Sequence, residues 1–282
     1  MCEPEHMPEI DFIQPGKRPR DILDESLPMM TILFPKIHDC DACLILCDGQ
    51  SMLVDCGTEN QAPAVMEVLA LSGIWNLDRI LITHPHPDHM GGLETVCREY
   101  DVAEILICFP ETENMWMHSI VNTAHEFGVS LKHFSDGETF SIGEAVMTAY
   151  QKAERTDNVN NRSPLLRLQY GNCVISFASD LEMKGLLDTA AQVPADMLKT
   201  DILKYPHHGK DPMPHEYYDL ADPGAVIVTA YYTGRRGQKN IGVHGWPAFY
   251  TFDGIWRLRS DGNNWEIRDL RRIQKATDTD LR

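Results

Sequence analysis

Short apolar runs, most of them rich in aliphatic and β-branched residues, recur along the chain between turn-forming residues. A buried strand has about 4–8 residues and a buried helix about ten or more, so short runs of this kind predict strands. The predicted strands lie near residues 30–34, 42–47, 51–54, 79–82, 104–108, 130–133, 145–150, 164–169, 173–178, 201–204, 225–229, 255–259 and 264–268.

Helical signals occupy fewer and longer segments. The segments near 61–72 and 113–127 stop at Gly73 and Gly128, and glycine is the residue that most readily ends a helix. A further helix is predicted near 182–191. This alternation of strands and helices favours an α/β fold in which helices cover mixed sheets.

The domain organisation follows from what the chain lacks. In its 282 residues we find no internal repeat, low-complexity tract or long linker that would separate a second domain. Residues 1–27 are rich in proline and acidic side chains and are predicted to be irregular. We therefore expect a single domain over residues 28–270 and a tail at 271–282.

The densest group of metal-binding side chains follows the strand predicted at 79–82. Residues 83–92 read T-H-P-H-P-D-H-M-G-G. His84 and His86 are two positions apart and face the same way on an extended segment, while the prolines keep that segment out of a helix. Asp88 and His89 then open a short helix. Imidazole and carboxylate together suit zinc or a similar divalent ion, and the pattern predicts two metals.

This H-x-H-x-D-H run before G-G resembles the signature of the metallo-β-lactamase-fold hydrolases. Residues 51–57 resemble the family's strand ending in D-x-G, and residues 174–180 resemble the strand that ends in an aspartate shared by both metals. Residues 202–209, I-L-K-Y-P-H-H-G, resemble the L-K-x-x-H-H-G segment of the branch that includes the hydrolase domain of the DNA-uptake protein ComEC. The resemblance implies a four-layer αββα sandwich.

The resemblance also implies two metal sites. The first would use His84, His86 and Asp180, completed by Asn161 or water. The second would use Asp88, His89, Asp180 and one histidine of the 207–208 pair. We expect His208 to be the ligand and His207 to contact the substrate or transition state, although the reverse assignment stays open.

Two segments depart from the family pattern. Many members carry an isolated third histidine before the shared aspartate, but residues 157–163 contain none; the ComEC-type branch has an N-x-S-like segment there. Residues 240–247 echo a later G-H-P segment, which makes His244 a further possible ligand.

The chemistry expected from this ligand set is hydrolysis. Two divalent ions about 3.5–4 Å apart share a hydroxide that serves as the nucleophile. The predicted catalytic residues are Asp88, His207 and Lys204. Lys204 either orients Asp180 or binds an anion, with an ordinary lysine at a strand end as the alternative. Asp55 is expected to fix a ligand histidine by hydrogen bonding.

Cysteines and charge limit other interpretations. The C-x-x-C spacing of Cys40 and Cys43, with Cys47 nearby, suggests either a second metal site or buried thiols, and the strand predicted at 42–47 favours buried thiols.

The net charge of −17 does not suit a protein whose main task is to bind a nucleic-acid backbone. Basic residues gather near the C-terminal end, where a solvated strand and tail are favoured over a rim for an anion: Arg257, Arg259, Arg268, Arg271, Arg272 and Lys275. The loop with Arg235, Arg236 and Lys239 is the better candidate for a phosphate contact.

These features together predict a metal-dependent hydrolase. His86 stands where redox di-iron relatives place a glutamate, and Asp180 with no third-motif histidine differs from the true β-lactamases. We expect two Zn²⁺ ions, with Mn²⁺ possible, and a phosphodiester substrate, either nuclease-like or small. The alternatives are carboxylic ester, thioester or lactone hydrolysis, or a non-catalytic metal-binding module.

No apolar run approaches the roughly 20 residues that span a bilayer, and we expect a cytoplasmic protein. The physiological substrate, a nucleic-acid partner and the oligomeric state are not determined by the sequence.

Overall fold

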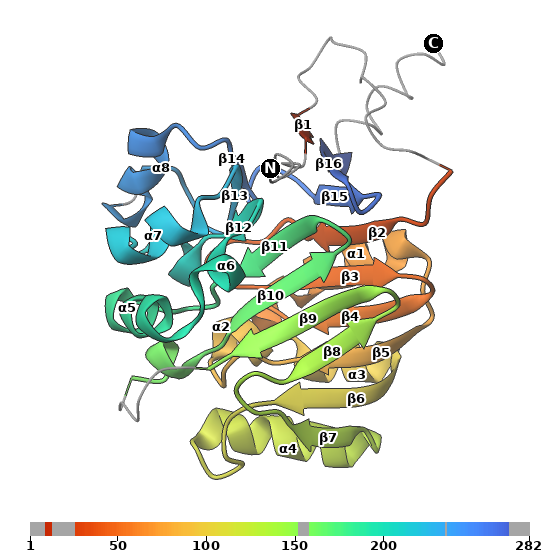
Figure 1. Ribbon diagram of the computed structural model, residues 1–282. Helices are drawn as coiled ribbons and strands as arrows, with labels where there is room; N and C mark the ends of the chain where they lie inside the picture. The colour runs from red at the N-terminus through yellow and green to blue at the C-terminus, as the bar shows by residue number, and fades with distance from the viewer. Residues whose placement is uncertain (1–8, 13–25, 152–157, 235, 271–282) are drawn as a thin grey trace.

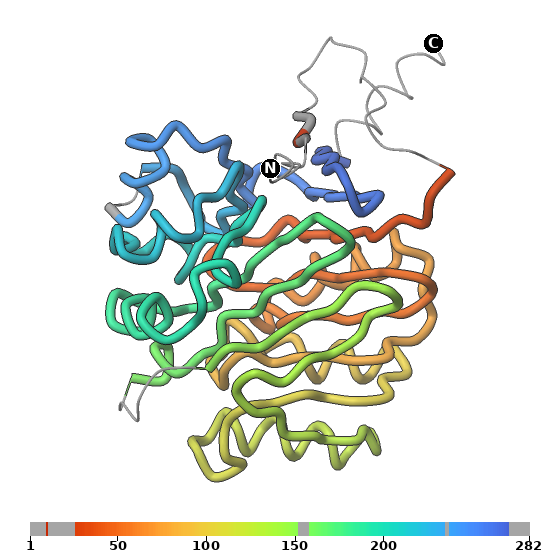
Figure 2. The backbone as a smooth tube through the Cα atoms, viewed as in Figure 1, coloured from red at the N-terminus to blue at the C-terminus, as the bar shows by residue number. Residues whose placement is uncertain are grey.

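Two β-sheets stacked face to face form the centre of the molecule, and helices cover their outer faces (Figure 1). The computed structural model describes residues 9–12, 26–151, 158–234 and 236–270. The backbone trace in Figure 2 shows the orange and yellow strands of the first sheet behind the green and teal strands of the second. The arrangement is the mixed α/β fold with two sheets that the sequence predicted.

The first sheet has the order β1-β16-β15-β2-β3-β4-β5-β6-β7. Its strands are β1 (Glu9–Phe12), β2 (Met30–Phe34), β3 (Cys43–Cys47), β4 (Gln50–Val54), β5 (Asn76–Leu81), β6 (Asp101–Ile107), β7 (Ser130–His133), β15 (Trp256–Ser260) and β16 (Asn264–Asp269). Strands β4 to β7 run parallel to one another, and the strands from β15 through β2 and β3 to β4 are antiparallel.

The second sheet has the order β14-β13-β12-β11-β10-β9-β8. Its strands are β8 (Thr139–Ile142), β9 (Ala145–Tyr150), β10 (Leu165–Tyr170), β11 (Cys173–Phe177), β12 (Ile202–Lys204), β13 (Ala225–Val228) and β14 (Ala248–Tyr250). Strands β11 to β14 are parallel, and β8 to β11 are antiparallel.

Helices connect the parallel strands. They are α1 (Ala62–Ser72), α2 (Pro87–Met90), α3 (Leu93–Glu99), α4 (Met115–Phe127), α5 (Met183–Gln192), α6 (Ala195–Leu198), α7 (His215–Ala221) and α8 (Lys239–His244). Short 3₁₀ turns are η1 (Glu59–Gln61), η2 (Asn160–Arg162), η3 (Pro206–Gly209) and η4 (Arg236–Gln238). Among the described residues, no helix has the length and apolar content needed to cross a bilayer.

Three separate apolar clusters hold the layers together. Successive strand residues point to opposite faces of a sheet, and in β13 Ile227 belongs to the cluster between the sheets while Val226 belongs to the cluster under the helices of the second sheet. In β3, Ile45 likewise faces the other sheet and Leu44 faces the cluster under α1, α3 and α4. Three clusters between four layers define the αββα sandwich.

Every predicted strand and long helix overlaps an observed element. Gly73 and Gly128 both adopt the left-handed conformation that ends α1 and α4, as predicted. Several short elements were not predicted from the sequence: β1, β8, β14, α3, α6, α7 and α8. Strand β1 lies within the segment predicted to be irregular and pairs with β16, whereas residues 1–8, 13–25 and the tail at 271–282 lie outside the described residues.

Candidate metal centre

The predicted metal loop begins where β5 ends, and Asp55, which directly follows the neighbouring strand β4, holds it in place. The Asp55 carboxylate accepts hydrogen bonds from the backbone N–H and hydroxyl of Thr83, both at 2.8 Å. It also accepts the Nδ1–H of His89 at 2.8 Å. Asp55 therefore orients the ring of His89, a predicted ligand.

The two glycines after the loop are required by close backbone contact. A Cβ on Gly92 would lie 2.3 Å from the carbonyl oxygen of Cys56, and one on Gly91 would lie 2.5 Å from that of Pro87. The contact brings the metal loop against the segment after β4, where the Cys56 N–H donates to the His89 carbonyl at 2.6 Å. The G-G pair thus permits the loop to reach the position that Asp55 stabilises.

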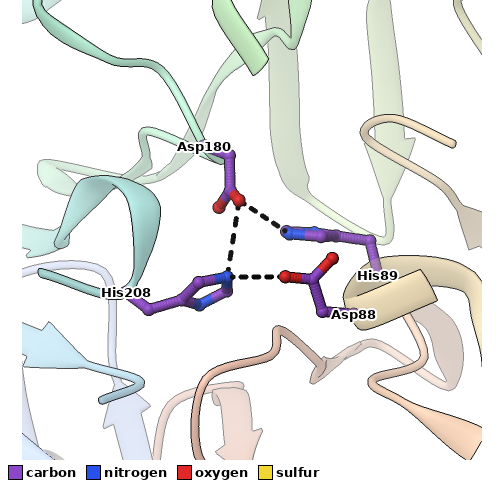
Figure 3. Close-up of side chains that lie close together, drawn as sticks. All are labelled: Asp88, His89, Asp180 and His208. Atoms are coloured by element: carbon purple, nitrogen blue, oxygen red, sulfur yellow. Dashed lines mark ion pairs between the residues drawn. The ribbon is translucent and has the colours of Figure 1, made fainter. Parts of the chain in front are cut away.

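Four predicted ligands converge from three strand ends. Ligand atoms of Asp88, His89, Asp180 and His208 all lie within 4.8 Å of one another (Figure 3). The Oδ2 atom of Asp180 lies 3.3 Å from Nε2 of His89 and 3.4 Å from Nε2 of His208. Nε2 of His208 is also 3.5 Å from Oδ2 of Asp88. These are the residues expected for the second metal site.

The position of His208 depends on Asp41, which the sequence analysis did not identify. Thr229 donates its hydroxyl to Oδ1 of Asp41 at 2.7 Å, and its own oxygen accepts the Nδ1–H of His208 at 2.9 Å. Lys204 forms a buried ion pair with the same carboxylate and donates to the carbonyl of Ser179 at 3.2 Å. Asp41 thereby aims Nε2 of His208 at Asp180.

The same hydrogen-bond pattern orients His84. The oxygen of Thr83 lies 3.1 Å from Nδ1 of His84, and since this hydroxyl donates to Asp55 it accepts the Nδ1–H. Nε2 of His84 then lies 3.9 Å from Oδ2 of Asp180 and 3.1 Å from Nδ1 of His86. His84 is therefore close to both Asp180 and His86. Among the described residues, however, neither His84 nor His86 belongs to a group of three or more residues whose ligand atoms all lie within 4.8 Å of one another.

The donor atoms at the centre fit a divalent cation. Nε2 of His89, Nε2 of His208 and Oδ1 of Asp180 are buried without a hydrogen-bond partner. Buried polar atoms in folded proteins nearly always have a partner, so two such nitrogens facing the same Asp180 carboxylate require an explanation. Nitrogen and carboxylate donors in this arrangement are those that zinc and related ions bind.

Buried opposite charges shift the pKa values of these groups strongly. Burial opposes ionisation of Asp180, but His208 and His89 hold its pKa well below the usual range. Burial likewise opposes protonation of His208, yet Asp180 and Asp41 raise its pKa to about 10. Burial lowers the pKa of His84 well below its ordinary value. A cation bound at Nε2 of His208 must displace a proton, so metal uptake releases protons near neutral pH.

Three residues predicted for the site have contacts other than the expected ones. Oδ1 of Asn161 accepts the backbone N–H groups of Glu182 at 3.1 Å and Gly185 at 2.9 Å, which commits it to the start of α5. His244 stacks on Trp246 with ring centroids 4.6 Å apart, at the end of α8. Lys204 is 3% exposed and paired with Asp41, so its side chain faces the interior. His244 does not join the groups of close ligand atoms within the described part of the chain.

Two charged side chains beside the centre were also missed. Lys210 lies next to the tandem histidines, and its Nζ is 3.9 Å from Oδ2 of Asp88, the most exposed of the converging ligands. Asp211 accepts the Nδ1–H of His207 at 2.7 Å. Both residues follow the H-H-G segment directly, but no spacing rule separates them from ordinary surface charges.

The remaining predictions concern cysteines and basic clusters. Cys40, Cys43 and Cys47 are buried free thiols, and burial raises the pKa of Cys40 to about 12. Arg257, Arg259 and Arg268 all lie within ion-pair distance of Glu266, which supports a structural role. Arg235 and the tail with Arg271, Arg272 and Lys275 lie outside the described residues, so the proposed phosphate contact of that loop stays a prediction.

Comparison with known families agrees with this geometry. Residues 38–153 match the family model of the metallo-beta-lactamase superfamily. That range contains strands β3 to β7 of the first sheet, the loop after β4 and the whole metal loop.

Two curated relatives and one solved structure are similar to this chain. ComE operon protein 3 of Bacillus subtilis (strain 168) is 26% identical over 164 residues, which cover 57% of this chain and 21% of that protein. Exodeoxyribonuclease YycJ of Bacillus anthracis is 32% identical over 148 residues, covering 51% of this chain and 53% of that protein. This chain therefore spans about half or less of the length of these relatives. The metallo-beta-lactamase fold protein YhfI of Bacillus subtilis superposes with a TM-score of 0.57 at 13% identity, over 82% of this chain and 99% of YhfI.

Proposed function

We propose that this chain, whose residues 38–153 match the metallo-β-lactamase superfamily and which has the fold of that family, is a hydrolase that cleaves phosphodiesters with two divalent metal ions. One observation carries the proposal: ligand atoms of Asp88, His89, Asp180 and His208, from three distant segments, lie within 4.8 Å of one another, and Nε2 of both histidines is buried without a hydrogen-bond partner. The name of the relative YycJ, an exodeoxyribonuclease, supports a phosphodiester over a carboxylic ester. The ComEC-type branch is supported by the similarity to ComE operon protein 3.

The donor set supports zinc as the resident ion. Four imidazoles, those of His84, His86, His89 and His208, accompany the carboxylates of Asp88 and Asp180 in the proposed sites. Imidazole nitrogen suits zinc far better than calcium or magnesium, which prefer oxygen ligands, while manganese tolerates mixed donors. Bound ions of this kind supply a hydroxide nucleophile at neutral pH and neutralise charge on a phosphate.

The chain's own residues would then bind and orient the substrate. Asp180 is 1% exposed and lies beneath the centre, whereas Asp88 and Lys210 are partly exposed, so the substrate approaches from their side. The Lys210 ammonium places positive charge beside the opening, where a phosphate oxygen would be held. His207 also faces the centre, with its Nε2 3.8 Å from Oδ2 of Asp180.

A substrate panel tests the proposal directly. The purified chain, loaded with Zn²⁺ or Mn²⁺, is assayed on bis-p-nitrophenyl phosphate and on p-nitrophenyl acetate, with bound metal measured in the same preparation. We expect two metals per chain and faster turnover of the diester. Faster turnover of the acetate would transfer the proposal to carboxylic esters, and less than one metal with no turnover would indicate a non-catalytic binding module.

Lys210 provides a test of the substrate class. Replacing it with alanine is expected to raise KM for the diester about tenfold, because a contact between an ammonium and a phosphate oxygen contributes about 1.5 kcal/mol. The value of kcat and the KM for p-nitrophenyl acetate, which carries no charge, should change little. The matched control is Lys132→Ala on β7, a lysine that is 64% exposed and pairs with Glu104. An equal rise in KM for both substrates would contradict a phosphate contact.

A further inference from the structure

The tandem histidines occupy an unusual stretch of backbone. His207, His208 and Gly209 have φ angles of 45°, 50° and 70°, three successive residues in the left-handed region. Each non-glycine residue there costs about 1–2 kcal/mol, and such strain persists where surrounding contacts impose it, often at functional sites. The turn makes both neighbouring imidazoles face Asp180, which an extended or right-handed segment would separate.

His207 shares one feature with His89, a carboxylate that accepts the Nδ1–H of its ring. Its Nδ1–H donates to Asp211 at 2.7 Å, as that of His89 donates to Asp55 at 2.8 Å. Histidines that bind metals usually donate their second ring N–H to a carboxylate, which fixes the ring and increases its basicity. Around Oδ2 of Asp180 lie four imidazole Nε2 atoms at 3.3, 3.4, 3.8 and 3.9 Å: those of His89, His208, His207 and His84.

The contacts of Asn160 indicate which ring nitrogen of His207 carries the proton. Its Nδ2 donates to Oε1 of Glu182 at 3.0 Å, which identifies that atom as the amide nitrogen because a carboxylate only accepts. The same nitrogen lies 3.4 Å from Nε2 of His207. Since an amide nitrogen only donates and Nδ1 already carries the proton toward Asp211, Nε2 presents a lone pair. A lone pair at Nε2 is what a metal ligand needs.

The first metal site lacks a third nitrogen ligand. Residues 158–163 contain no histidine, and the side-chain oxygen of Asn161 is committed to α5. We propose that His207 binds the first metal ion through Nε2, together with His84, His86 and Asp180, while His208 binds the second. The two tandem histidines are then divided between the two sites. This inference rests on the proposed two-metal centre and goes beyond it.

A different cluster offers the alternative reading. Glu182, His207 and Asp211 have ligand atoms within 4.8 Å of one another, so a cation could instead bind Nδ1 of His207. However, the Glu182 oxygens already accept amide hydrogens from Asn158 and Asn160, at 2.9 and 3.0 Å. Nδ1 is likewise engaged by Asp211. Nε2 is engaged more weakly, by the amide nitrogen of Asn160 at 3.4 Å, so the geometry favours Nε2.

Metal titration of the full chain decides the inference without relying on activity. Chelator-treated wild type, His207→Ala and Asp211→Asn are titrated with Zn²⁺ against a colorimetric chelator, and Co²⁺ absorption spectra report the ligand environment. The wild type should bind two ions. His207→Ala should keep one tight ion and lose affinity for the other by about 100-fold or more, and Asp211→Asn should lose about 10- to 100-fold at the same site. The control is His215→Ala, whose imidazole is 70% exposed on α7.

The outcomes separate this inference from the proposed function. Two tight ions and an unchanged Co²⁺ spectrum in His207→Ala would overturn the ligand assignment while leaving the hydrolase intact. A wild type that binds fewer than two ions would overturn the two-metal centre and the assignment with it. Three ions in the wild type, the third lost in Asp211→Asn, would place His207 in the other cluster and overturn binding through Nε2. Circular dichroism of each variant verifies that the fold is retained.

Discussion

Turnover of bis-p-nitrophenyl phosphate is expected to fall about 10³-fold or more when Asp180 is replaced by asparagine. This carboxylate is 1% exposed, and one of its oxygens lies within 4.0 Å of four imidazole nitrogens. Asparagine keeps the size of the side chain but removes the negative charge that two cations would share. The variant should therefore bind fewer than two Zn²⁺ ions, and its loss of rate should follow its loss of metal.

Both quantities are measured in one preparation, by elemental analysis for metal and by initial rates for turnover. Asp219→Ala is the matched control, because that aspartate lies on α7 with its side chain 66% exposed. It should keep the wild-type rate and metal content. If Asp180→Asn retained two ions and more than about a tenth of the rate, the shared-aspartate model would be wrong.

Much of the fold was predictable because several of its strands are buried on both faces. Ala225–Val228, for example, has no polar interruption, which is typical of a parallel strand covered on both sides. Short elements were harder to recognise. Strand β8 is only Thr139–Ile142, with alternating exposure, and it becomes a strand by pairing with β9. Its four residues carry too little pattern to outweigh the turns around them.

In the candidate site, too, some residues were predictable from the sequence and others were not. His84, His86, Asp88 and His89 form a local pattern with fixed spacing, so the sequence alone predicts them as ligands. Asp41 acts on His208 across 167 positions of sequence, and it precedes β3 in a segment whose C-x-x-C spacing does not indicate a role for the aspartate. Its role arises only when the carboxyl ends of the parallel strands of both sheets meet at one edge of the sandwich. Supporting residues of this kind are set by the fold and leave no local signature.

The residue type of Lys204 did not predict its main contact. A lysine at a strand end next to H-H-G suggested contact with an anion or with Asp180, whereas the structure buries it against Asp41. Its bond to the Ser179 carbonyl still links it to the turn that carries Asp180. Lys204 therefore contacts both Asp41, which orients His208, and the turn that carries Asp180.

Replacing Lys204 with methionine is expected to lower the free energy of unfolding by about 3–5 kcal/mol. Methionine fills the volume of the lysine side chain but removes the ammonium that pairs with the buried Asp41 carboxylate, which leaves the His208 ring, at 3.1 Å, as its cationic partner. Thr229 still donates to that carboxylate at 2.7 Å, but a neutral hydroxyl does not replace the lost ammonium. Urea unfolding of chelator-treated protein measures the change without a contribution from bound metal. Lys184→Met is the control, because that lysine is 55% exposed in an i,i+4 pair with Asp188 and should change stability by less than about 1 kcal/mol.

A second substitution separates the charge from the packing. In Lys204→Met combined with Asp41→Asn, the unpaired charge is gone while the amide oxygen of residue 41 can still accept from Thr229. The double variant should recover about half or more of the lost stability. It should not recover zinc affinity, since His208 no longer has a carboxylate behind its ring and such support is worth about 10- to 100-fold in metal binding. A single variant within about 1 kcal/mol of the wild type, or a double variant less stable than either single one, would show that the pair between Lys204 and Asp41 does not stabilise the base of the metal centre.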